Sequence, residues 1–215
     1  GTSYNTVDFF LLADIQLMVV IPEPTSIENA YRFIKNSFFR QVFHNSKNFG
    51  WKSVVTPILR IDNPYNITTP KTLIDYFNKL GGSKTVFIEE QLQIFMPKII
   101  LNQVRTEKDK LVGLAMKDAC SKYFNINMTF LGYISEDESV WKSVLNRKPL
   151  AVASPDGVPM QQLKTICSDI LLKETELTSK NNLLSKLAQW LLAKTPPFMK
   201  GQVIIRLLVC RARLL

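Results

Sequence analysis

The first apolar run of the sequence, from Ile15 to Ile21, is nearly continuous and rich in β-branched residues. Such a run predicts a strand that is buried on both faces of a parallel sheet. A Pro-Glu-Pro segment at 22–24 follows, and its missing amide donors should end the strand. Thr25 and Glu28 have the spacing of a capping box, with Thr25 as the N-cap of a helix. The apolar residues that share one face of this helix are Ile27, Ala30, Tyr31, Ile34, Phe38 and Val42.

The same order of strand, loop and helix recurs twice along the chain. Residues 99–101 predict a second strand, with a helix from about Glu107 to Phe124 after it. Residues 130–134 predict a third strand, followed by a helix through Val140 and Val144, and a last helix should run from about Val158 to Leu172. This alternation predicts an α/β fold with an open parallel sheet and right-handed crossovers.

Ligands of open parallel sheets bind beyond the carboxyl ends of the strands. The loops that follow the three predicted strands are Pro22–Ser26, Asn102–Arg105 and Ser135–Asp137. We therefore expect these three loops to lie together on the ligand side of the sheet.

The segment at about 44–96 has a less regular pattern and is expected to be a helical insertion. Thr69-Pro70 is a helix start with proline at the first position, and Gly81-Gly82 should end that helix. A second short helix is predicted from Val86 to Phe95. The insertion offers a surface for a protein partner.

Composition places the chain among ordinary globular proteins, since 46% of its 215 residues are hydrophobic and 21% are charged. The cysteines Cys120, Cys167 and Cys210 are odd in number and widely spaced, which fits a reducing cytosol and excludes a disulfide framework. No apolar run approaches the roughly 18 residues that a membrane-spanning helix needs.

The net charge of +9 is concentrated at the end of the chain. All 18 acidic residues lie at or before Glu176, together with 20 of the 27 basic ones. Residues 1–176 are therefore nearly neutral, at about +2, while the residues after Glu176 carry +7. We expect residues 1–173 to form the domain and residues 174–215 a basic helical tail. Such a tail suits an anionic membrane surface at least as well as DNA.

Candidate catalytic chemistry is scarce. The one histidine, His44, falls near the end of a predicted helix, where a surface or capping role is expected, because no partner that would make it a base is evident. The acidic residues of 136–138 precede a helix and are expected to cap its first turn rather than bind a metal. The sequence contains no complete Gly-rich phosphate loop.

Five segments, in order and with the right spacing, resemble MinD/FlhG-type P-loop ATPases over about residues 1–173. They are Gly1–Asn5 with Asp8–Asp14, Pro22–Ser26, Leu101–Arg105, Leu131–Ile134 with Asp137, and Arg147–Leu150. They are similar to the family's stretch after the Walker B aspartate, its Pro-Glu-x-x-Ser loop, its Asn-Arg-like motif and its closing Gly-x-Ile-Pro-x-Asp and Arg-x-Pro-Leu pattern. The resemblance implies a P-loop NTPase fold of the deviant-Walker, SIMIBI-like class. It also implies that the chain is the C-terminal part of a longer protein and begins inside switch II.

The resemblance implies nucleotide-binding roles for Gly1, Asn102, Arg105 and Ser135. Asn102 would recognise adenine through its paired donor and acceptor, although a turn-forming asparagine is the alternative. Gly1 would lie near the γ-phosphate. Ser135 stands where the family usually has proline, which weakens that part of the match.

ATP and Mg²⁺ are the cofactors implied for the full-length protein. The Walker A lysines, the Mg²⁺-binding hydroxyl and the Walker B aspartate would all precede Gly1. Phosphoryl transfer depends on those groups, so this chain alone should not hydrolyse ATP.

The basic tail is similar in kind to the amphipathic membrane helices of MinD-type proteins. Its candidate membrane-contacting residues are Lys200, Arg206, Leu207, Leu208 and Arg213. The alternative is a helix that packs on its own domain.

Three hypotheses of function follow. The first is an ATPase that dimerises with ATP and positions flagella or the division site, cytoplasmic and peripheral on the inner membrane, with an SRP-type flagellar GTPase as one partner. The second is a non-enzymatic interaction module derived from the same fold. The third is a ParA-like DNA-partitioning ATPase, for which the distribution of charge gives less support.

Overall fold

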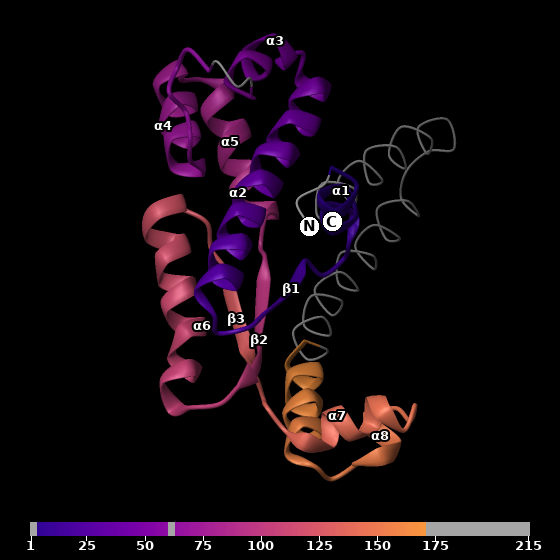
Figure 1. Ribbon diagram of the computed structural model, residues 1–215. Coiled ribbons are helices and arrows are strands. Elements are labelled where there is room, and N and C mark those ends of the chain that lie inside the picture. Colours follow the sequence, from indigo (N-terminus) through magenta and orange to yellow (C-terminus); the bar gives the residue numbers. More distant parts are fainter. Residues whose placement is uncertain (1–3, 60–62, 171–215) are drawn as a thin grey trace, which may run out of the picture. The chain divides into compact units, whose positions relative to one another are not determined.

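A parallel sheet of three strands forms the centre of the computed structural model, which describes residues 4–59 and 63–170 (Figure 1). The strands are β1 (Leu17–Val20), β2 (Lys98–Val104) and β3 (Thr129–Ser135), and they lie in the order β1-β2-β3 with both neighbouring pairs parallel. Helices flank the sheet. The predicted α/β fold with an open parallel sheet is therefore confirmed. By its contacts the chain divides into two units, Gly1–Leu163 and Lys164–Leu215, and the description below concerns the first unit and residues 164–170.

The helix α2 (Pro24–Ser46) follows β1, but the predicted capping box at its start is wrong. Its N-cap is Glu23, Pro24 occupies the first turn, and no side chain caps the helix. Proline has a fixed φ and no amide hydrogen, so it fits the first helical position and starts the helix before Thr25. The Ser26 hydroxyl instead accepts a hydrogen bond from the Ile21 amide at 3.2 Å.

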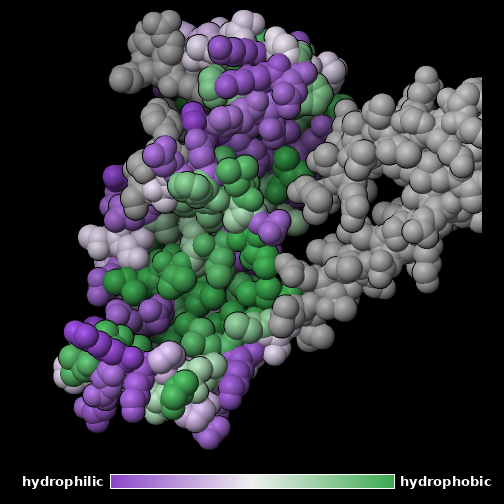
Figure 2. All heavy atoms as spheres, turned by 90° about the vertical axis from the view of Figure 1, so that its right-hand side faces the viewer, coloured by the Kyte–Doolittle hydropathy of each residue, from purple (hydrophilic) through white to green (hydrophobic). Residues whose placement is uncertain are grey.

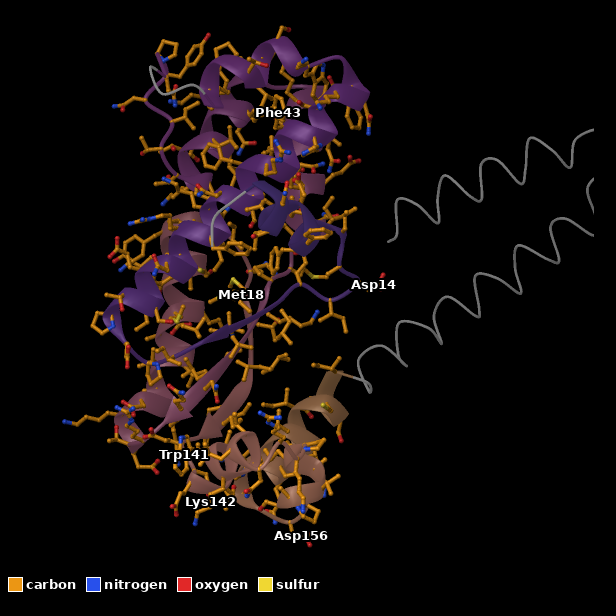
Figure 3. All side chains as sticks on the ribbon, turned by 45° about the vertical axis from the view of Figure 1, so that its right-hand side comes forward. Asp14, Met18, Phe43, Trp141, Lys142 and Asp156 are labelled. Atoms are coloured by element: carbon orange, nitrogen blue, oxygen red, sulfur yellow. The ribbon has the colours of Figure 1, made fainter. Side chains whose placement is uncertain are left out.

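The main core lies between one face of the sheet and the helices α2 and α6 (Glu107–Ala119). The predicted apolar face of α2 is confirmed, because Ala30, Ile34, Phe38 and Val42 are buried there and Ile27 and Tyr31 pack at its border. Met18 of β1 points into this core (Figure 3). Each strand thus presents alternate side chains to the two helices.

The expectation that the first strand is buried on both faces is wrong. In β1 buried and exposed residues alternate, and the side chains of Leu17 and Val19 are 37% and 61% exposed. The reason is that α2 and α6 both cover the same face of the sheet. Figure 2 views the molecule from the right-hand side of Figure 1. It shows a broad apolar surface on that side, where α1 and β1 lie.

The first described helix is α1 (Tyr4–Leu12). The helix packs on α2. Its Asp8 carboxylate accepts two hydrogen bonds of 2.8 Å from the Arg40 guanidinium. This partly exposed, two-pronged ion pair fixes the contact between the two helices.

The insertion consists of short helices, as predicted. They are the 3₁₀ turns η1 (Lys47–Phe49) and η2 (Thr56–Leu59) and the helices α3 (Lys52–Val55), α4 (Pro70–Leu80) and α5 (Ser83–Ile94). Thr69 caps α4 in a reciprocal pair with Thr72, and Gly81 ends it with a φ of 69°. The start and end predicted for α4 are thus confirmed, while α5 begins three residues before the predicted Val86.

The third strand and its neighbouring helices agree with the prediction. The helix α6 continues as a π-helical turn, η3 (Cys120–Phe124). After β3 come α7 (Glu138–Leu145), α8 (Leu150–Ala153) and a helix over 158–170. In the described ranges, no helix is long and apolar enough to cross a membrane.

Candidate functional site

The loops after the three strands meet at one edge of the sheet, which is its lower end in Figure 1. They connect β1 to α2, β2 to α6 and β3 to α7. This is the edge at which the sequence placed the ligand side. The arrangement follows from the parallel order of the strands.

The end of β2 differs from the prediction, because Asn102, Gln103 and Val104 belong to the strand rather than to the loop after it. The register with β3 breaks between Leu101 and Val104, and Gln103 has a φ of 56°. This is a bulge, which bends a strand and redirects its side chains. Asn102 lies within the bulge and is half-buried.

Arg105 follows the bulge and forms an ion pair with Glu136, which lies just after β3. Its Nε and one terminal nitrogen donate to the two carboxylate oxygens, the second at 3.2 Å. The Glu136 amide also donates to the Val104 carbonyl at 3.0 Å. These bonds, with Glu136 as acceptor, raise the pKa of Arg105. The loops after β2 and β3 are therefore joined by both backbone and side chains.

Asp109 satisfies the amides at the start of α6. Its Oδ2 accepts hydrogen bonds of 2.9 Å from the backbone amides of Arg105 and Thr106, and the Asp109 amide donates to the Thr106 hydroxyl. The two backbone bonds lower the pKa of the Asp109 carboxyl. This capping box was not predicted, although the order Thr-x-x-Asp at 106–109 carries its signature.

A cavity of about 190 Å³ lies between the loops after β1 and β2. It is lined by Ile21, Pro22, Glu23, Gln103, Arg105, Thr106 and Asp109. Typical small-molecule sites enclose roughly 300–1,000 Å³. The cavity therefore suits one ring or another small group better than a whole nucleotide.

Ser135 is the last residue of β3 rather than part of the loop after it. Its amide donates to Gln162 Oε1 at 2.8 Å, and Gln162 Nε2 donates to the Ser135 hydroxyl at 2.9 Å. Of the predicted nucleotide-binding residues, only Arg105 lines the cavity. Asn102 lies on β2, three residues before Arg105. Gly1 and the tail residues Lys200 to Arg213 lie outside the described residues.

The remaining candidate groups are His44 and the acidic residues of 136–138. His44 lies 3.6 Å from Asp8 and its side chain is 42% exposed; burial and then Arg40 lower its pKa, against the opposing effect of Asp8. Asp137 caps α7 by accepting from the Ser139 amide at 2.7 Å, which confirms the capping predicted for this acidic segment. Within residues 4–59 and 63–170, no group of three or more metal-ligating side chains is arranged to hold a metal ion.

The site as a whole is a small, partly acidic cavity at the carboxyl edge of a parallel sheet, with one arginine that is already engaged by a glutamate. No protein-family model matches the chain, and a comparison with curated proteins gave no significant match.

Proposed function

We propose that this chain is the C-terminal portion of a MinD/FlhG-type ATPase, of the deviant-Walker P-loop class. In this proposal ATP binding and hydrolysis drive dimerisation and membrane association, and the protein regulates flagellar placement or division-site position. The sequence segments that resemble the family support it. So does the parallel sheet, whose order places the loops after all three strands at one edge.

The observation that carries the proposal is the cavity between the loops after β1 and β2. Its lining includes Pro22, Glu23 and Arg105, which belong to two of the resembling segments. The cavity has room for a base, and the polar side chains around it supply hydrogen bonds. In this proposal the base end of the nucleotide binds here, and the phosphates bind to residues that precede Gly1 in the family.

The first experiment measures the binding of adenine nucleotides to the purified chain by isothermal titration calorimetry. ATP and ADP should bind, weakly and with similar affinity, and GTP should bind less. Gln103→Ala should weaken binding at least about fivefold, since the Gln103 amide lines the cavity and an amide that reads adenine with two hydrogen bonds contributes roughly 1–3 kcal/mol. Asn127→Ala is the matched control, because Asn127 is an exposed asparagine before β3, at the opposite edge of the sheet.

Absence of any nucleotide binding, or an equal effect of the two alanine variants, contradicts the proposed site.

The proposed membrane association is tested separately. The protein is sedimented with anionic vesicles and with DNA, in the presence of ATP or ADP. Sedimentation with DNA alone contradicts membrane association and favours the DNA-partitioning alternative.

A second function, that of a non-enzymatic interaction module, is favoured by the apolar surface of the described unit. Val19 on β1 and Phe9 and Leu12 on α1 are 61%, 76% and 80% exposed. Large exposed apolar patches mark sites of association. If ATP and ADP leave the unfolding temperature of the protein unchanged, this second function is preferred.

A further inference from the structure

Two features beside the cavity would normally create a site for an anion. One is Arg105, whose guanidinium suits phosphate and carboxylate groups. The other is the amino end of the 13-residue helix α6, where free amides and the helix dipole attract negative charge. In this protein one carboxylate of the chain engages Arg105, and another accepts from the two backbone amides just before the helix.

Glu136 engages Arg105 from the neighbouring strand. Nε and one terminal nitrogen donate to its carboxylate, so one of the two edges through which the guanidinium could meet a phosphate in the two-pronged manner is occupied. The Glu136 amide is fixed on the Val104 carbonyl at 3.0 Å. The carboxylate is therefore held opposite Arg105 by the backbone as well as by its charge.

The two backbone amides just before α6 are engaged by another carboxylate. Those of Arg105 and Thr106 both donate to Asp109 Oδ2 at 2.9 Å. Glu23 adds another carboxylate to the lining of the cavity. The charges of Glu136, Glu23 and Asp109 all act on the Arg105 guanidinium, and the lining of the cavity has more carboxylates than basic groups.

We propose that Glu136 is a specificity-determining residue of this cavity. By holding Arg105 it excludes phosphate and other anions, and it leaves the cavity to an uncharged group that can donate hydrogen bonds. The identity of that group as the base of a nucleotide rests on the proposed function. The exclusion of anions does not.

The test compares the binding of inorganic pyrophosphate to four forms of the full chain by calorimetry at low ionic strength. They are the wild type, Glu136→Gln, the double variant Glu136→Gln/Arg105→Gln, and Glu138→Gln. The last removes the same charge two residues further on, where Glu138 pairs with Lys142 of α7 at 3.1 Å. The side chains of Arg105 and Glu136 are 60% and 48% exposed, so Glu136→Gln should fold normally, which circular dichroism verifies.

Glu136→Gln should bind pyrophosphate about fivefold more tightly than the wild type, because one released charge acts across a short, partly screened distance. The double variant should lose this gain, and Glu138→Gln should equal the wild type. Equal affinities for Glu136→Gln and Glu138→Gln overturn the inference, as does a gain that survives the loss of Arg105.

Adenosine, titrated in parallel, separates this inference from the proposed function. A gain of pyrophosphate binding without any adenosine binding supports the role of Glu136 and contradicts the nucleotide site. Adenosine binding with no gain for Glu136→Gln supports the nucleotide site and overturns the role of Glu136.

Discussion

The close approach of Gly113 on α6 to Phe130 on β3 permits a quantitative prediction. A Cβ atom added to Gly113 would lie 2.3–2.6 Å from three atoms of the Phe130 ring, far inside van der Waals contact. The ring packs against the core and has to move to make room. Overpacking of this kind costs roughly 1–3 kcal/mol, while replacing a glycine inside a helix by alanine gains about 1 kcal/mol. Gly113→Ala should therefore destabilise the protein by about 1 kcal/mol.

Urea unfolding followed by circular dichroism at 222 nm measures this change. Ala115→Gly, at an exposed position of the same helix, gives the helix-propensity term alone and should cost about 1 kcal/mol. Adding Phe130→Leu to Gly113→Ala should recover part of the loss, because it shortens the opposing side chain. If Gly113→Ala instead raises stability by the amount that Ala115→Gly lowers it, the reasoning from the close contact is refuted.

Three further predictions concern the described groups. Thr69→Ala should cost about 1 kcal/mol of unfolding free energy, as expected for the loss of a helix cap, whereas Thr25→Ala should have little effect because no side chain caps α2; urea unfolding distinguishes them. The ion pair with Arg40 lowers the pKa of Asp8, so its stabilising effect is complete above the ordinary value of 3.8 and is lost as the pH falls below it; Asp8→Asn should flatten that part of the stability-against-pH curve. Burial raises the pKa of Cys120 to about 12, so N-ethylmaleimide at pH 8 should label the exposed Cys167 in the native protein and Cys120 only after unfolding, as peptide mass spectrometry can show; labelling of both thiols at similar native rates contradicts the buried position of Cys120.

The elements that could be predicted from the sequence are those whose signals are local. The apolar period of α2, the Thr69-Pro70 start of α4 and the alternation of strands with helices depend on neighbouring residues, and the structure agrees with each. The start of α2 was misjudged because two local signals competed there. A capping pattern at Thr25 lost to the preference of Pro24 for the first turn.

Features that depend on residues far apart along the chain could not be predicted from the sequence. An apolar run cannot reveal whether one or two faces of a strand are covered, because that depends on which side the later helices take, and Val19 proved exposed. The bulge at Gln103 and the pairing of Arg105 with Glu136 depend on how β2 meets β3. The edge of the sheet where the site lies could be predicted, but the charge balance of the site could not.

The uncovered face of β1 has a consequence for how the protein behaves on cooling. Any association that buries Leu17 and Val19 is driven by the removal of apolar surface from water, a force that weakens as the temperature falls. Contacts made through this face should therefore loosen in the cold and tighten on warming. Cold storage is thus the condition under which this part of the molecule stays most separate from its neighbours.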